Sequence, residues 1–259
     1  MISFQELTST FLSPEGDALN MDAPESWAQG RTLYGGLSAA LCHLAAQAHT
    51  STTKPMKSAL VYFVGPSSGH LSGRAETLRQ GRSTEVVEAT LMAEKGVGTR
   101  AVFVYGDHRE SRIRQSSLMM PEVDAPEECP DFFGSRRPAF AQHFDCRKAG
   151  GYQPVTSAPE GEMLVWCRHN TPVGDDQLAA LLALADVLPP AVFTMFAEPA
   201  PISTITWSVE ILQSEPVVDN NWFLFQSLAD HTENGYSSQA MYLWDREGRP
   251  VLAARQNVT

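Results

Sequence analysis

The hydrophobic and polar positions divide the chain into two similar series, each an apolar helix followed by four strands. In the first series, residues 35–48 are rich in Ala and Leu, with no Pro or Gly after the opening pair. This pattern predicts a buried helix of about three to four turns. Segments rich in Val, Thr, Tyr and Phe, separated by Gly, Pro and Ser, then predict antiparallel strands. These strands are Lys57–Gly65, Leu71–Gln80, Ser83–Ala93 and Val97–Tyr105.

The second series has the same order after two extra predicted strands, Phe140–Cys146 and Met163–Arg168. Asp175 and Asp176 supply acidic residues at a helix start, and residues 177–188 are apolar almost all round, which predicts a second buried helix. Four predicted strands follow the helix. They are Ser203–Leu212, Trp222–Asp230, Ser238–Trp244 and Val251–Val258.

One local pattern occurs in both series: a Gly-x-Ser turn, a strand, a charged turn ending in Gly, and a returning strand. Ser83 and Ser237 of this pattern lie 154 residues apart (237 − 83), and Gly96 and Gly248 lie 152 apart (248 − 96). The nearly constant separation predicts two related domains fused in one chain. At local offsets of 152 and 150 residues, Gln256 would correspond to Val104 and Thr204 to Lys54.

The repeat sets the expected domain organisation. We predict an N-terminal domain over residues 1–106, a linker over 107–138 that is rich in charge, Pro and Ser, and a C-terminal domain over 139–259. A helix wrapped by a long antiparallel sheet, made twice, is the double-hotdog architecture. The expected fold is therefore α+β, with two antiparallel sheets that each wrap around a central helix.

Composition narrows the class of protein. Apolar residues make up 43% and charged residues 19% of the chain, as in ordinary soluble globular proteins. The formal net charge of −11 argues against a nucleic-acid partner, because neutralising phosphates needs a basic surface. The most apolar stretch, Leu178 to Phe193, is interrupted by Asp186 and two prolines and is too short to span a membrane.

The beginning of the sequence has no basic region followed by an apolar run, so no secretory signal is visible. The four cysteines have no C-x-x-C spacing and read as free thiols in a reducing compartment. We therefore expect a cytoplasmic protein. The same lack of ligand spacing leaves no metal site to predict.

The motifs resemble acyl-CoA thioesterases of the double-hotdog type, similar to bacterial thioesterase II, from about Trp27 to Val258. The matching segments are GRTLYGG at 30–36, YFVGP at 62–66, ETLRQGRS at 76–83, WCR at 166–168, LADVLP at 184–189, STITWS at 203–208 and ARQ at 254–256. The resemblance implies an acyl-CoA substrate, with coenzyme A entering as part of the substrate and no other cofactor. It does not indicate the length or type of the acyl chain.

The resemblance also implies a site in the second half of the chain, made of Asp186, Thr204 and Gln256. After its Thr the bacterial pattern continues Ile-Asp-His, whereas this chain has Ile205, Thr206 and Trp207. That difference bears on rate and substrate choice more than on the fold.

The residues themselves support Asp186 most. A carboxylate in an apolar segment is costly unless it is hydrogen-bonded, and a helix C-terminus disfavours negative charge. The alternative is a solvent-facing residue where the helix frays before Pro189. Thr204 and Gln256 each read alone as an ordinary strand residue. A carboxylate could act as general base while Thr and Gln side chains hold the water.

A helix N-terminus can stabilise the oxyanion of thioester hydrolysis, and Gly35 and Gly36 open the first predicted helix. Close helix packing explains these glycines equally well. Two other functions stay open: an acyl-CoA-binding protein without activity, and a hotdog enoyl-CoA hydratase or dehydratase, whose Asp-x-Asn-x-x-His motif is missing. Exposed sheet edges would also allow a homodimer.

Overall fold

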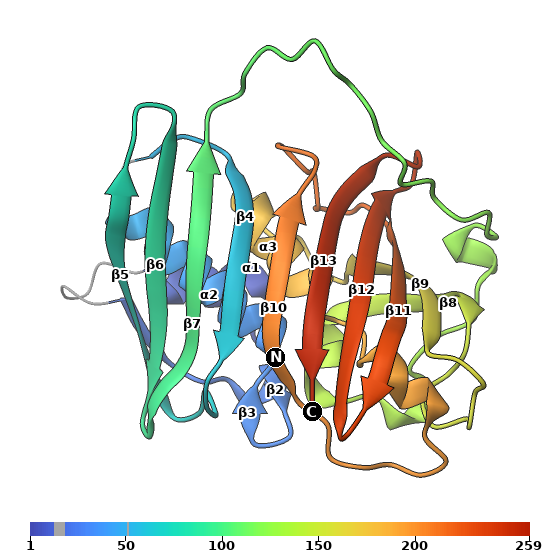
Figure 1. Cartoon of the computed structure of the whole chain (residues 1–259). Coiled ribbons are helices and arrows are strands. Elements are labelled where there is room, and N and C mark those ends of the chain that lie inside the picture. The colour runs from blue at the N-terminus through green and yellow to red at the C-terminus, as the bar shows by residue number, and fades with distance from the viewer. Residues whose placement is uncertain (13–18, 51) are drawn as a thin grey trace.

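The computed structural model describes residues 1–12, 19–50 and 52–259. Its main feature is one antiparallel sheet of eleven strands in the order β1-β5-β6-β7-β4-β10-β13-β12-β11-β9-β8 (Figure 1). The strands are β1 Leu19–Asp22, β4 Met56–Phe63, β5 His70–Gln80, β6 Thr84–Ala93, β7 Gly96–Gly106, β8 Phe144–Gly151, β9 Glu162–His169, β10 Thr204–Ile211, β11 Phe223–Glu233, β12 Tyr236–Asp245 and β13 Pro250–Val258. A separate two-stranded ribbon joins β2 Ala28–Gln29 to β3 Thr32–Leu33.

The halves of the sheet meet where β4 pairs with β10, with Leu60 opposite Ser208. This pairing changes one part of the expected fold. The sequence led us to expect two sheets, but backbone hydrogen bonds run from one half into the other, so the sheet is continuous. The expectation of long antiparallel strands around buried helices agrees with the structure.

Two helices lie side by side on one face of the sheet (Figure 1). α2, Gly35–His49, packs against β5, β6 and β7 as well as against α3, Gln177–Ala185. Both are rich in Ala and Leu, and their buried residues form the core with the inward-facing strand positions. Asp176 caps α3 by accepting a hydrogen bond from the N–H of Ala179 at 2.9 Å.

The second helix ends three residues before the predicted Leu188. Leu188 precedes Pro189, and the proline ring disfavours the helical conformation in the residue before it. Asp186 consequently occupies the C-cap position of α3. The carboxylate of Asp186 therefore lies at the C-terminal end of α3.

The predicted elements are wrong or incomplete in several places, and strands β1, β2 and β3 were not predicted. The first residues of the predicted strand Phe140–Cys146 belong to the 3₁₀ helix Ala139–His143, and strand β8 starts only at Phe144. The ring of His143 stacks on that of Trp27, with 3.8 Å between the ring centroids. Helix α1, Phe4–Phe11, was not predicted, although Ser3 and Glu6 form a capping box at its start.

The two halves carry β-bulges at equivalent places. In the first half, the register shifts lie at 77/79 between β5 and β6, at 91/92 between β6 and β7, and at 56/58 between β4 and β7. In the second half, they lie at 229/231 between β11 and β12, at 243/244 between β12 and β13, and at 204/206 between β10 and β13. The repeat therefore extends to backbone irregularities, which fixes the correspondence of residues between the halves.

This correspondence corrects two pairings inferred from sequence offsets. The bulges align Thr204 with Met56 rather than with Lys54, and Gln256 with Phe103 rather than with Val104. A constant offset misplaced them because the connections within the two halves differ in length by a few residues. Thr204 and Gln256 of the second half still correspond to apolar residues in the first half.

The connection between the halves covers part of the sheet. Between Gly106 and Pro126 it has no helix or strand, and it passes above the sheet in Figure 1. It then lies on the outer face of the C-terminal half, where the indole N–H of Trp166 donates to the carbonyl of Asp124 at 2.9 Å. Met120 and Val123 pack there against a small second core. The domain boundaries at residues 106 and 138 stay a prediction.

Among the described residues, no helix is long and apolar enough to cross a membrane. All four cysteines are free thiols and buried.

Candidate functional site

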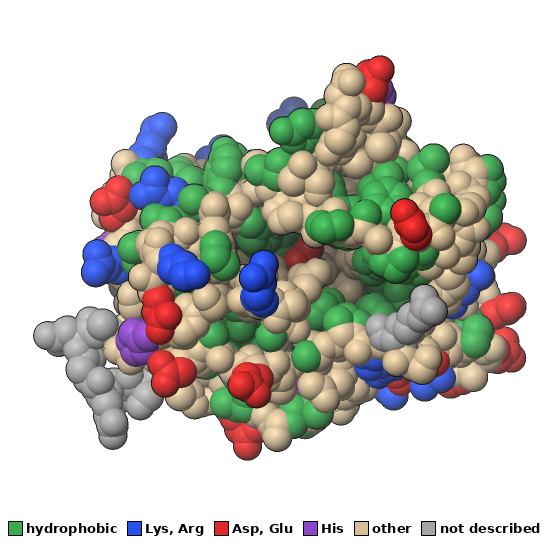
Figure 2. All heavy atoms as spheres, turned by 90° about the horizontal axis from the view of Figure 1, so that it is seen from below, with side chains coloured by type: hydrophobic (Ala, Val, Ile, Leu, Met, Phe, Trp, Pro, Cys, Tyr) green, Lys and Arg blue, Asp and Glu red, His purple; other side chains and the backbone are tan. Residues whose placement is uncertain are grey.

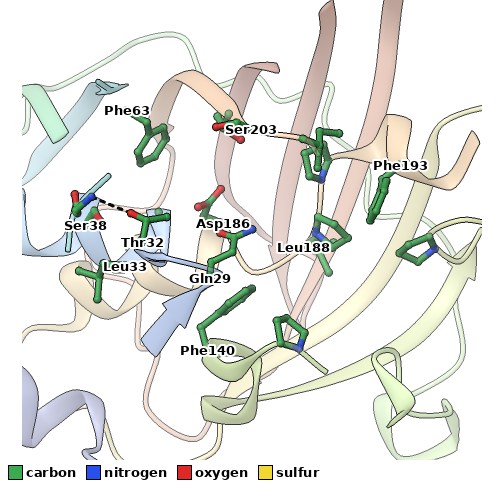
Figure 3. A pocket seen from close by; sticks show the side chains of 18 of the residues that line it. Gln29, Thr32, Leu33, Ser38, Phe63, Phe140, Asp186, Leu188, Phe193 and Ser203 are labelled. Carbon is green, nitrogen blue, oxygen red and sulfur yellow. Dashed lines mark hydrogen bonds between the residues drawn. The ribbon is translucent and has the colours of Figure 1, made fainter. Parts of the chain in front are cut away.

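A cavity of about 780 Å³ lies between the start of α2, the end of α3 and the start of β10 (Figure 3). Its wall is mostly apolar and rich in aromatic rings and prolines. The rings are those of Phe63, Phe132, Phe133, Phe140 and Phe193. Seen from below, the molecule has a hollow bordered mainly by hydrophobic side chains (Figure 2). Among the described lining residues, Asp186 alone carries an acidic or basic side chain.

Asp186 is held by donors on two sides. Its Oδ1 accepts a hydrogen bond from Nε2 of Gln256 at 2.6 Å, and the backbone N–H of Gly36 also donates to its carboxylate. Oδ2 lies so close to Gly35 that a Cβ there would be 2.6 Å away. The side chain is partly buried and points toward the cavity (Figure 3). The alternative of a solvent-facing residue at a frayed helix end does not fit this placement.

Burial raises the pKa of the Asp186 carboxyl from its usual 3.8 to about 7. The apolar surroundings disfavour the ionised form, and this effect exceeds the opposing effect of the hydrogen bonds from Gln256 and Gly36. A carboxyl group with a pKa near neutrality can both accept and return a proton at physiological pH. Such a value is typical of a general acid or base.

Gln256 lies on the last strand, β13, with only 3% of its surface exposed. Its Oε1 accepts a hydrogen bond from Nε2 of Gln239 on β12 at 2.7 Å. Gln239 was not predicted as part of the site. The register of the hairpin could have found it, because Gln239 and Gln256 are direct cross-strand partners.

Thr204 begins strand β10 and lines the same cavity as Asp186. The structure thus brings together all three residues that the resemblance implied: two on the cavity wall, and Gln256 hydrogen-bonded behind one of them. They come from the end of α3 and from two neighbouring strands of the sheet.

The segment that differs from the bacterial pattern lies beside this group. Trp207 is buried with 1% of its surface exposed and is the cross-strand partner of Gln256. Its indole N–H has no hydrogen-bond partner among the described residues. Thr206 points to the other face of β10, as strand alternation requires. The difference therefore places a large buried ring at the position paired with Gln256.

The two glycines that open α2 have different surroundings. A Cβ on Gly36 would lie 2.8 Å from the carbonyl oxygen of Ala183 and from ring atoms of Tyr34, so Gly36 allows α2 and α3 to pack closely. Gly35 lines the cavity, and a Cβ there would meet Asp186 and the Phe63 ring. Close packing thus accounts for Gly36, whereas Gly35 contributes to the wall of the cavity.

In the part of the chain that the structure describes, no group of three His, Cys, Asp or Glu side chains could hold a metal ion. The histidines near the predicted strands hydrogen-bond to the backbone instead. Nε2 of His169 contacts the carbonyl oxygen of Ala180 at 2.9 Å, and Nε2 of His143 contacts that of Ser26 at 3.0 Å.

Comparison with known structures finds close similarity over almost the whole chain. A conserved protein of unknown function with a hot dog fold from Alicyclobacillus acidocaldarius has a TM-score of 0.87 at 26% identity, covering 97% of both chains. The tesB protein of Mycobacterium avium subsp. paratuberculosis has a TM-score of 0.80 at 18% identity, covering 99% of this chain and 98% of that one. An acyl-CoA thioesterase II from Mycobacterium marinum has a TM-score of 0.76 at 15% identity, covering 97% and 96%. These similarities show the hotdog fold.

A search of curated proteins finds no match to this chain. Family models do match both halves. The model of the acyl-CoA thioesterase N-terminal domain matches residues 23–106, and that of the C-terminal domain matches residues 121–259. Together with the fold, these matches confirm the resemblance stated from the motifs: the chain belongs to the acyl-CoA thioesterase family.

Proposed function

We propose that this protein hydrolyses an acyl-CoA thioester to the free acid and coenzyme A, using a water molecule activated by Asp186. The observation that carries the proposal is the Asp186 carboxylate itself. It is the acidic group of a mostly apolar cavity, its pKa is about 7, and hydrogen-bond donors fix its orientation. A catalytic carboxylate needs all three properties.

In the proposed reaction, the oxygen of a water molecule attacks the thioester carbonyl carbon while Asp186 takes one of its protons. The tetrahedral intermediate then collapses, the carbon–sulfur bond breaks, and Asp186 returns the proton to the departing thiolate. The hydroxyl of Thr204 holds the water in line, and the amide of Gln256 holds the carboxylate that activates it. The products are the carboxylic acid and the thiol of coenzyme A.

The carbonyl oxygen gains negative charge during attack and needs donors close by. The first turn of α2 reaches the cavity at Gly35, and the N–H groups of a first turn are not used within the helix. This placement supports the carbonyl lying against α2. The acyl chain would then occupy the apolar part of the cavity between the aromatic rings, and coenzyme A would extend toward the surface.

The test is thiol release from a panel of short, long and aromatic acyl-CoAs by the wild-type protein and by Asp186→Asn. We expect the substitution to lower kcat/KM at least ~10²-fold on every ester that the wild type cleaves, because it removes the base. Near-normal turnover by Asp186→Asn would exclude the carboxylate from this role.

The same panel separates the alternatives. An acyl-CoA-binding protein would bind the esters, measured by calorimetry, without releasing thiol. A hydratase would add water to an enoyl-CoA, seen as loss of the conjugated absorbance, again without free thiol. Either result with the wild-type protein would contradict the proposed hydrolysis.

We also propose that the reaction needs no metal or added cofactor, because water, the carboxylate and two neutral side chains account for every proton transfer. Thiol release should persist after dialysis against EDTA. Loss of activity that a divalent cation restores would contradict this part of the proposal.

A further inference from the structure

Three hydrogen bonds connect Asp186 to the backbone at the start of the 3₁₀ helix Ala191–Met195. The N–H of Ala191 donates to Oε1 of Gln239 at 2.6 Å, Nε2 of Gln239 donates to Oε1 of Gln256 at 2.7 Å, and Nε2 of Gln256 donates to Oδ1 of Asp186 at 2.6 Å. We call this series the amide relay. Both glutamines are almost completely buried, with 1% and 3% of their surfaces exposed.

The backbone end of the amide relay fixes the orientation of every amide in it. A backbone N–H can only donate, so the atom of Gln239 that faces Ala191 must be the carbonyl oxygen. The amide nitrogen of Gln239 then faces Gln256, which must present its own oxygen there. Gln256 is left with its nitrogen toward Asp186. The N–H of Ala191 therefore ensures that Asp186 meets a donor, the partner that a carboxylate requires.

The other half of the protein shows that the fold does not require this relay. The bulges align Gln239 with Val87 and Gln256 with Phe103, which are also direct cross-strand partners and are fully buried at 0% exposure. The same backbone positions thus hold an apolar pair in one half and an amide pair in the other. Buried amides need hydrogen-bond partners that an apolar pair does not.

We propose that Gln239 is a positioning residue for the hydrolysis, acting through Gln256 to keep an N–H donor aimed at the carboxylate of Asp186. This inference rests on the proposed function. Gln239 is absent from the cavity wall and acts only on the orientation of its neighbour. Without it, Gln256 is free to turn its amide, and the carboxylate loses a fixed donor in a poorly solvated position.

The experiment compares Gln239→Met, Gln256→Met and the double variant, with Met241→Leu as the control. Met removes the polar ends of the glutamines while keeping their length, and Met241 is a buried residue of the same strand outside the amide relay. For each protein, kcat and KM are measured from pH 5 to 9. The titration of the Asp186 carboxyl is followed by ¹³C NMR, its signal being assigned by its absence from Asp186→Asn.

We expect Gln239→Met to lower kcat/KM about tenfold at pH 7, mainly through kcat, and to move both the acidic limb and the carboxyl titration upward by about half to one pH unit. The double variant should titrate like Gln256→Met alone, because Gln239 acts through Gln256. Met241→Leu should leave both curves in place.

Two results would overturn the inference. One is a Gln239→Met protein that melts at a lower temperature but keeps the wild-type acidic limb and carboxyl titration, which would indicate a purely structural role. The other is a shift in the double variant equal to the sum of the single shifts. If the wild-type protein released no thiol from any ester while the carboxyl titration still shifted as expected, the proposed function would fail and the amide relay would stand.

Discussion

Gln256 donates a hydrogen bond to Asp186 across 2.6 Å, joining the last strand of the sheet to the end of a helix 70 residues earlier in the chain. The bond places a neutral donor against a carboxylate that has lost most of its solvent. Because it stabilises the ionised form, it limits how far burial raises the pKa of Asp186. Several consequences of this arrangement can be measured.

The first concerns the pH dependence of hydrolysis. A general base must be ionised, and the pKa of Asp186 is about 7. We expect kcat/KM to fall about tenfold per pH unit below that value and to level off above it. A rate profile from pH 5 to 9 with a substrate that does not titrate in this range measures the limb. A limb centred near pH 4 would show that the essential carboxylate is not this one.

The second concerns stability. Between pH 3.8, the usual pKa of the carboxyl, and about 7, the folded state holds a proton that the unfolded state has released. The free energy of unfolding therefore decreases as pH rises through that window, because the stabilisation from the bound proton is lost. Asp186→Asn has no such dependence, so its stability relative to the wild type should increase from pH 4 to pH 8 by on the order of 2 kcal/mol, allowing for solvent in the cavity.

Urea unfolding of both proteins at pH 4, 6 and 8 tests this expectation. A constant difference across the three pH values would show that the carboxyl has an ordinary pKa in the folded protein. A variant that is inactive yet more stable at pH 8 would show that this site costs the protein stability.

The third prediction separates the two glycines of α2. Alanine normally stabilises a helix relative to glycine by up to about 1 kcal/mol. At Gly35 its Cβ would lie 2.6 Å from Oδ2 of Asp186, so we expect Gly35→Ala to lower kcat/KM at least about tenfold by displacing the carboxylate. At Gly36 the Cβ would meet the backbone of α3 at Ala183, so Gly36→Ala should mainly lower the melting temperature.

Thermal melting and kinetics on both variants distinguish these effects. The contrast would be refuted if Gly35→Ala were fully active, or if Gly36→Ala melted at the wild-type temperature.

The fourth prediction concerns the hydroxyl of Thr204. Valine has nearly the same shape and is as favourable in a strand, so Thr204→Val should fold normally. We expect kcat to fall about 10- to 100-fold, because the water loses one of the groups that hold it. Thr206→Val is the matched control and should keep wild-type kinetics, because a bulge separates Thr206 from Thr204 on the same strand and Thr206 is not part of the cavity wall. Equal activity of the two variants would remove Thr204 from the site.

The sequence predicted most of the fold because its signals are local. The apolar run at 35–48, the strand segments and the hairpin turns depend on neighbouring residues, and the positive φ of Gly96 and Gly248 agrees with turns at both places. Local signals do not report how strands from different halves pair. The continuous sheet depends on the pairing of Leu60 with Ser208, which no single segment encodes.

Local sequence signals also predicted part of the candidate site. Asp186 is conspicuous because a carboxylate in an apolar segment conflicts with its surroundings. Gln239 was missed because a glutamine within a strand has no such local conflict, and its hydrogen bond to Gln256 depends on the register that places the two residues opposite each other. The alignment of the halves from sequence was wrong by one residue at Gln256 and by two at Thr204. The connections between strands differ in length between the halves, whereas the bulges lie at equivalent places in the strands.

The shared bulges give this protein an internal reference. Since both halves bend and twist at the same points, the chain contains two solutions of side-chain chemistry on one backbone, one of them apolar and the other polar at matching positions. Side-chain differences between the halves can therefore be compared on one backbone, with temperature, solvent and expression identical by construction.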